Sequence, residues 1–93
     1  MKIRPTPQFS RDLKKILKKN YDKKKFEKVL KLITLGEKMI LKRAYRDHSL
    51  KGNWKGYREC HIDADWLLIY RIENEGHVCE LVLIRTGNHD QLF

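Results

Sequence analysis

The chain has 93 residues, which is enough for one domain with a modest core and too few for two. Hydrophobic residues make up 41% of it, which favours a folded domain and argues against a disordered basic tail. The formal net charge of +9 favours a polyanionic partner: nucleic acid, an anionic membrane or an acidic protein. No signal-peptide region or bilayer-spanning apolar run is evident, so a cytoplasmic location is expected.

The chain is predicted to open with a short strand and a first helix. The first four residues, MKIR, suit a strand that Pro5 and Pro7 terminate. Ser10 is predicted to cap a helix over Arg11–Lys19, in which apolar residues recur at helical spacing. Asn20 and the residue after it are expected to form a tight connection to a second helix.

The second helix is predicted from its cap to its terminator. Asp22 suits the N-cap, the helix runs to about Leu35, and Gly36 ends it. Two short amphipathic helices joined tightly predict a helical hairpin. Ten Lys or Arg and three acidic residues lie between Arg11 and Lys31, which indicates either a solvated helix face or a surface that binds along phosphates. The lysines alone do not decide between the two.

The C-terminal half is predicted to be a loop followed by an antiparallel sheet. The pattern from Glu37 to Arg43 is weak, although the apolar run MIL within it is expected to be buried. Residues 44–56 are predicted to be a loop rich in turn residues. Three strands come next at hairpin spacing, over Tyr57–Ile62, Asp65–Ile72 and Val78–Arg85.

The strand register is fixed if Ile62 faces Asp65 across the first turn and Ile72 faces His77 across the second. One face then carries an apolar cluster that is expected to hold the helices: Cys60, Ile62, Leu67, Ile69, Val82 and Ile84. The other face is aromatic and polar and suits a ligand: Tyr57, Glu59, His61, Trp66, Leu68, Tyr70, Leu81, Leu83 and Arg85. A slip of one residue would exchange the faces. The same register separates Cys60 from Cys79 by two strand spacings, about 9.5 Å, which argues against a disulfide.

This register gathers residues suited to RNA cleavage at one end of the sheet. His61 and Arg85 share a face there, and Asp65, at the start of the middle strand, can reach them only around the strand end. His89 lies in a short tail that can fold back to Arg85, whereas the register does not place His48. A base and an acid can move protons while the RNA's own 2′-OH attacks, and a guanidinium can stabilise the phosphate charge.

A metal is not required for such a reaction. A site built from His61, Asp65 and His89 is conceivable, but the sequence contains no tight ligand motif such as HExxH or CxxC. We therefore expect no metal and no cofactor.

The segments YRDHSLKGNWKGYRECHIDADWLLIYRI and LIRTGNHDQLF resemble the YafQ-like branch of the RelE superfamily of bacterial toxins. The resemblance implies a single α+β domain over residues 1–93, with two N-terminal helices packed on one face of a small antiparallel β-sheet. It also implies a toxin that enters the ribosomal A site, cuts mRNA there and inhibits translation. Its implied partners are the ribosome with bound mRNA and a cognate antitoxin, expected to be acidic, partly disordered and DinJ/RelB-like.

Every residue that the family uses has a match in this chain. The matching residues are His48, His61, Asp65, Trp66, Arg85, His89 and Phe93. We assign Arg85 to phosphate charge and His89 to protonation of the leaving oxygen. The base, or the group that orients it, is Asp65, His48 or His61.

Residues outside that proton-transfer set are assigned to RNA binding. Trp66 and Phe93 are expected to hold bases or to pack the tail over the site. Lys51 and Lys55, in the glycine-flanked loop, complete the RNA-binding set. The departures from the family pattern are small: Arg46, Ala64 and Asn88 replace its commoner residues.

Two alternatives from other functional classes remain open. The superfamily also resembles non-catalytic, gyrase-poisoning toxins of the ParE type, which share the fold but lack the histidine set His48, His61 and His89. A basic nucleic-acid-binding module, such as a DNA-binding regulator, is a weaker alternative because no recognition-helix motif is evident.

Overall fold

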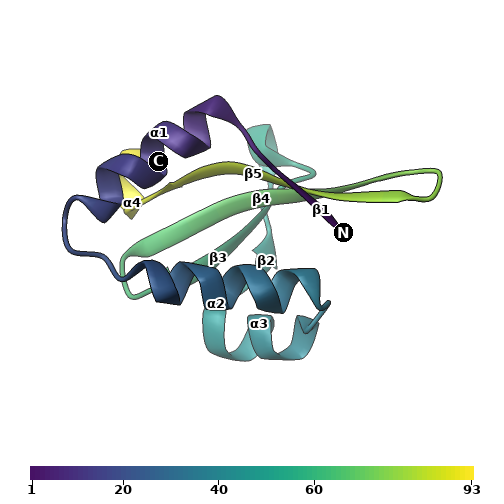
Figure 1. Ribbon diagram of the computed structural model, residues 1–93, viewed down its shortest axis with the longest axis horizontal. Helices are drawn as coiled ribbons and strands as arrows, with labels where there is room; N and C mark the ends of the chain where they lie inside the picture. The colour runs from purple at the N-terminus through teal and green to yellow at the C-terminus, as the bar shows by residue number, and fades with distance from the viewer.

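The computed structural model describes residues 1–93 as one mixed sheet with helices on both faces (Figure 1). The elements in chain order are β1 (Lys2–Pro5), α1 (Pro7–Leu17), α2 (Lys23–Thr34), α3 (Lys38–Tyr45), β2 (His48–Ser49), the 3-10 turn η1 (Gly52–Trp54), β3 (Arg58–Asp63), β4 (Trp66–Glu75), β5 (Val78–Gly87) and α4 (His89–Leu92). The strand order is β1-β5-β4-β3-β2, with β1 parallel to β5 and the other pairs antiparallel. The predicted α+β class is confirmed.

The helix caps explain where the first two helices begin. The side chain of Thr6 accepts a hydrogen bond from the Phe9 N–H at 3.1 Å, and Pro7 occupies the first helical turn. The prediction of Ser10 as the cap was therefore wrong, because Thr6 followed by proline is the stronger start signal. Asp22 caps α2 as predicted, accepting from the Lys24 N–H at 2.9 Å.

A third helix, α3, lies where the sequence pattern was weak. Among its residues only Leu41 is buried, whereas Met39 and Ile40 are exposed, contrary to expectation. One buried position gives no helical periodicity to detect, which explains why the helix was missed. The chain leaves α3 through Arg46, whose φ of 51° is left-handed.

The helices α1 and α2 share one core without forming the predicted hairpin. The first packs along β5 and the second beside α3 and β3 (Figure 1). They meet through the rings of Phe9 and Phe26, whose centroids are 5.7 Å apart. The shared core consists of Phe9, Ile16, Phe26, Val29, Ile33, Leu41, Cys60, Ile62, Trp66, Leu68, Tyr70, Leu81 and Leu83. None of the helices is long and apolar enough to cross a bilayer.

The register of β3 against β4 differs by one residue from the predicted one. His61 pairs with Leu67, Asp63 pairs with Trp66, and a β-bulge lies between them at Ile62. Cys60 and the bulged Ile62 therefore share the helix-covered face with Trp66 and its alternate neighbours, not with Leu67. The predicted ligand face was wrong, because the bulge shifts the alternation of side chains by one residue, while the two-residue turn moves to Ala64 and Asp65.

The second hairpin is longer than predicted. Its strands pair out to Glu75 and Val78, so Gly76 and His77 form a two-residue turn in which Gly76 has φ +58°. This hairpin projects beyond the helices in Figure 1. Cys79 pairs with a position of β4 six residues beyond the partner of Cys60, about 20 Å along the strand, and both thiols are free.

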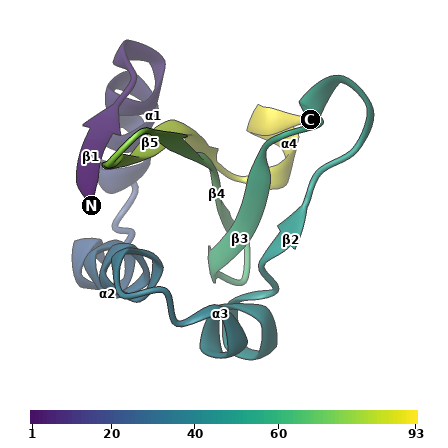
Figure 2. The ribbon, with the colours of Figure 1, turned by 90° about the vertical axis from the view of Figure 1, so that its right-hand side faces the viewer.

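The opposite face of the sheet carries α4 and the loop before β3 (Figure 2). Leu92 of α4 packs on Leu67 and Ile69, beside the half-buried Trp54 and Tyr57 of the loop. We call this the α4 face. It bears Glu59, His61, Leu67 and Ile69, because directly paired and alternate strand residues point the same way. A second β-bulge, at Ile84 of β5, brings Arg85 to this face opposite Ile69, although Leu83 lies in the helix-covered core.

Candidate functional site

One row of paired residues crosses four strands of the α4 face. His48 pairs with Glu59, Glu59 with Ile69, and Ile69 with Arg85. Directly paired residues share a face, so His48 and Arg85 stand on the same side of the sheet at the same level. His61 comes two residues after Glu59 on β3 and therefore joins this face. His61 and Arg85 were predicted to share one face at one end of the sheet, and the pairing confirms it.

A buried carboxylate, Glu59, lies between two imidazoles. Its Oε1 is 3.5 Å from Nε2 of His61 and 3.8 Å from Nε2 of His48, and the residue is 7% exposed. A carboxylate in this place orients either ring and forms an ion pair with whichever ring is protonated. Sequence reasoning missed Glu59 as a functional residue. The available signal was its position two residues before His61, on the same face of the strand.

The backbone around His48 is fixed by a polar cluster. Nδ1 of His48 lies 2.7 Å from the carbonyl oxygen of Arg46. That carbonyl can only accept, so Nδ1 carries the proton, and a neutral ring then presents its lone pair on Nε2. On either side of His48, the guanidinium of Arg58 donates to Asp47 at 2.7 Å and to Ser49 at 2.8 Å.

A tyrosine completes that cluster from beneath. The hydroxyl of Tyr70 donates to the second oxygen of Asp47, and both side chains are buried. Burial raises the pKa of Tyr70, and the hydrogen bond to Asp47 raises it further, so the phenol stays protonated as the donor. The cluster holds β2 in place and with it the position of His48 opposite Glu59.

Arg85 is held by a carboxylate from α1 that the sequence did not point to. Its Nε and one terminal nitrogen donate to the two oxygens of Asp12, at 3.0 Å and 3.1 Å, and the same carboxylate accepts from the Thr86 amide and from Gln8. Burial alone would raise the pKa of Asp12, but the hydrogen bonds from Arg85, Gln8 and Thr86 outweigh it and lower the pKa. The hydrogen bond to Asp12 likewise raises the pKa of Arg85. This clamp leaves 30% of the Arg85 side chain exposed for an anion.

The third group of predicted residues gathers around α4. Asp65 was predicted to start the middle strand, but it lies in the turn just before β4, where its Oδ1 accepts the N–H of His89 at 3.2 Å. The ring of His89 lies 5.4 Å from that of Phe93, which lies 6.2 Å from that of Trp54. A capping box between Asn88 and Gln91 fixes the start of this short helix. The tail that carries His89 is thus anchored to the sheet, with the imidazole exposed.

Trp66 does not belong to the accessible site. It is 0% exposed, its ring packs against Tyr21 and Phe26, and its Nε1 donates to the Thr86 hydroxyl at 2.8 Å. A ring buried in the core cannot stack on a base, so its assignment to RNA binding was wrong. Phe93, 51% exposed, has an accessible ring.

The remaining candidates lie in the loop before β3 and at the far hairpin turn. Lys51 and Lys55 are exposed on either side of η1. His77 occupies the far turn of the β4–β5 hairpin, ten residues along β5 from Gly87, or about 30 Å. No three His, Cys, Asp or Glu side chains converge as a set of metal ligands.

Comparison with known proteins identifies relatives over the whole chain. The family described as "Bacterial toxin of type II toxin-antitoxin system, YafQ" matches residues 1–93. The mRNA interferase toxin YafQ of Escherichia coli (strain K12) is 37% identical over 86 residues, which cover 92% of this chain and 88% of the relative.

Solved structures agree with this match in fold. The crystal structure of a metal-bound toxin from Helicobacter pylori has a TM-score of 0.83 and 38% identity, covering 100% of this chain and 99% of that one. The crystal structure of the E. coli DinJ-YafQ complex has a TM-score of 0.81 and 36% identity, covering 98% of this chain and 96% of the matched chain.

Proposed function

This chain belongs to the YafQ family of bacterial type II toxin–antitoxin toxins, and we propose that it cuts mRNA in the ribosomal A site, with the RNA's own 2′-OH as nucleophile. It acts as an mRNA interferase, that is, as an endoribonuclease, and its partner is a DinJ-like antitoxin. We place it in the cytoplasm, where mRNA is translated.

The observation that carries the proposal is the pair of imidazoles around Glu59 on the face that also bears Arg85. In this arrangement an imidazole of His48 or His61, oriented by Glu59, removes the proton from the 2′-OH. The 2′-oxygen then attacks the adjacent phosphorus, and the bond to the 5′-oxygen of the next nucleotide breaks. No water molecule is needed as a nucleophile in that step.

Two further tasks of the reaction, stabilising the charge on the phosphate and protonating the leaving 5′-oxygen, fall to separate residues. Arg85 contacts the phosphate oxygens and stabilises their developing charge, since a guanidinium remains cationic and can contact two oxygens at once. His89 protonates the departing 5′-oxygen, with Asp65 holding the backbone from which it projects. The products are then a 2′,3′-cyclic phosphate, or the 3′-phosphate into which it opens, and a 5′-hydroxyl.

The ribosome supplies what an isolated RNA lacks. The site is an open face with exposed groups, so the 2′-OH of a free RNA would rarely lie in line with the bond to be broken. Lys51, Lys55 and the overall charge of +9 attract ribosome-bound RNA without choosing its sequence. Phe93 stacks on a base of the unpaired codon.

Primer extension on translating ribosomes and on the same RNA free in solution tests the proposal. The expected result is cleavage within the A-site codon on ribosomes and little cleavage of the free RNA. Equal rates on both substrates would exclude a ribosome-dependent activity. An absence of cleavage on ribosomes, combined with growth arrest, would favour a non-catalytic toxin of the ParE type.

A further inference from the structure

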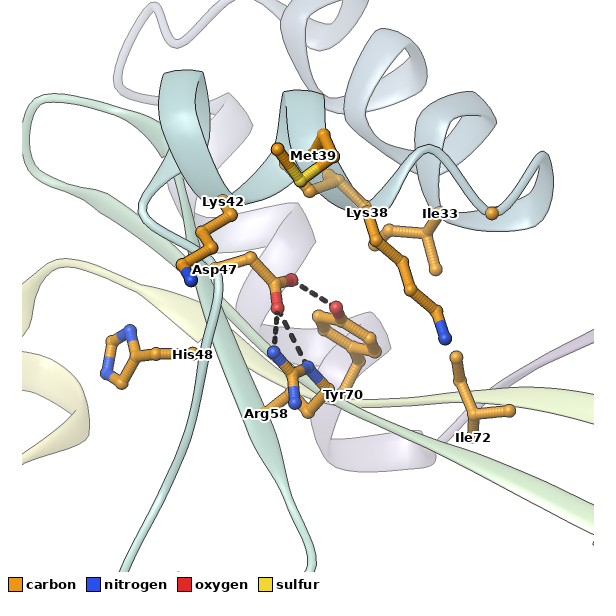
Figure 3. A pocket seen from close by; sticks show the side chains of 11 residues that line it. Ile33, Lys38, Met39, Lys42, Asp47, His48, Arg58, Tyr70 and Ile72 are labelled. Atoms are coloured by element: carbon orange, nitrogen blue, oxygen red, sulfur yellow. Dashed lines mark hydrogen bonds and ion pairs between the residues drawn. The ribbon is translucent and has the colours of Figure 1, made fainter.

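A groove on the other side of the molecule lies between α3 and the end of the sheet. It has a volume of about 470 Å³, within the range of ligand-binding pockets. Figure 3 shows Met39, Lys38 and Lys42 of α3 on one wall, Ile72 of β4 at one end and His48 at the other. The groove is therefore distinct from the α4 face but adjoins one of its histidines.

The walls of this groove are apolar inside and cationic outside. Ile33, Leu41 and Tyr70 form a buried floor, whereas Met39 is 57% and Ile72 is 40% exposed at the rim. The exposed Met39 and Ile72 extend the apolar floor to the rim, and a contiguous apolar patch of this kind marks an interaction site. They suit a partner that brings apolar side chains of its own.

The charges select the kind of partner. Lys38, Lys42 and Arg58 line the groove, and the single carboxylate there, Asp47, is already bound by Arg58 and Tyr70. The two lysines are therefore free for acidic groups from outside. A second copy of a chain with net charge +9 is disfavoured by like-charge repulsion.

RNA fits the groove less well than a peptide does. The ring of Tyr70 is 2% exposed with its hydroxyl engaged, so it offers no stacking surface for a base. The apolar floor would face the polar backbone of a nucleic acid without compensation.

We propose that this groove is the docking site for an acidic amphipathic segment of the antitoxin, with apolar side chains on Met39 and Ile72 and carboxylates on Lys38 and Lys42. The inference rests on the toxin–antitoxin function proposed above. A segment seated here also covers His48, which gives the antitoxin a route to inhibition from behind the α4 face.

The direct test compares Met39→Glu with Ile40→Glu, its neighbour on α3, which is 45% exposed and does not line the groove. Affinity for the purified cognate antitoxin is measured by calorimetric titration, and folding is checked by circular dichroism. Met39→Glu should weaken binding by about tenfold or more, since it puts a charge against an apolar floor. Ile40→Glu should bind within about twofold of the parent. Equal affinities for the two variants would overturn the proposal.

A footprint on the unmodified chain gives an independent readout. Met39 and Met1 are 57% and 51% exposed, so both thioethers should oxidise with dilute peroxide in the free toxin. Bound antitoxin should protect Met39 and leave Met1 reactive. Unchanged oxidation of Met39 in the complex would contradict docking in the groove.

The charge pair separates a protein partner from RNA. Lys38→Glu/Lys42→Glu should weaken antitoxin binding and make it less dependent on salt, whereas Lys24→Glu/Lys28→Glu on α2 serves as the matched control. If the first pair lowers ribosome-dependent cleavage and leaves antitoxin affinity unchanged, the groove serves RNA and the proposal fails. Cleavage by the parent chain is scored separately, so an inactive parent would refute the proposed function while the binding data still decide on the groove.

Discussion

Removing the carboxylate of Asp12 separates the positioning of Arg85 from its charge. Asp12→Ala deletes the two hydrogen bonds to Arg85 and leaves the Thr86 amide, in a 2% exposed residue, without its acceptor. The unpaired amide costs about 1–3 kcal/mol. The ion pair adds about 0–1 kcal/mol, because 30% of the Arg85 side chain is exposed and water screens it. The expected loss of about 2–3 kcal/mol lowers the melting temperature by roughly 10–20 °C.

The same substitution should slow cleavage, although Asp12 does not touch the substrate. An unclamped guanidinium samples other rotamers, so single-turnover cleavage should fall by about tenfold or more. Asp22→Ala is the matched control: it removes a carboxylate that caps α2 and costs about 1 kcal/mol, but it lies outside the site and should leave the cleavage rate of the folded enzyme unchanged.

The pH dependence of unfolding tests whether the charge of the Asp12 carboxylate causes the difference in stability. The folded-state pKa of Asp12 lies below its ordinary value, so its contribution is present above the unfolded pKa and is lost as pH falls through the folded value. Urea unfolding should therefore separate parent and Asp12→Ala clearly at pH 7 and less below about pH 4. An equal difference at both pH values, or parental cleavage by Asp12→Ala when Arg85→Ala is impaired, would refute the reasoning.

Three further substitutions test the rest of the site. His89→Ala should reduce single-turnover cleavage by at least about a hundredfold, whereas His77→Ala on the distant turn should cleave like the parent. An equal loss of cleavage in both variants would show that the site has been placed at the wrong end of the sheet. Glu59→Gln should slow cleavage by about tenfold or more, whereas Glu27→Gln on the exposed face of α2 should leave the rate unchanged. Cleavage by Glu59→Gln at the parental rate would show that Glu59 has no part in the mechanism. Trp66→Phe should lower the free energy of unfolding in urea by about 1–3 kcal/mol, and the folded variant should still cleave RNA. Loss of cleavage without loss of stability would instead indicate that Trp66 has a role in RNA binding.

Local signals were sufficient to predict most of the secondary structure. The Asp22 cap and the Gly36 terminator mark the two ends of α2, and hairpin spacing located the three long strands. These features depend on neighbours within a few residues, so the sequence displays them directly. The second turn was misplaced because the strands continue through the polar residues Glu73 and Glu75, where the hairpin projects away from the core.

Long-range features could not be predicted in the same way. The bulge at Ile62 reversed the face assignment, so Trp66 was taken for a ligand-facing ring when it lies in the core. Asp12 looked like one acid within a lysine-rich helix, and only the packing of α1 on β5 brings it to Arg85. Glu59 gained its place between two imidazoles once β2 had paired with β3.

The most direct measurement replaces a single 2′-hydroxyl in the mRNA. Ribosomes are programmed with two messages that differ only by a 2′-deoxy nucleotide on the 5′ side of the scissile bond in the A site. The all-ribose message should be cut to leave a 2′,3′-cyclic or 3′-phosphate and a 5′-hydroxyl, and the 2′-deoxy message should stay intact because its nucleophile is missing. Cleavage of the 2′-deoxy message at a comparable rate would contradict attack by the RNA's own hydroxyl and require a different nucleophile.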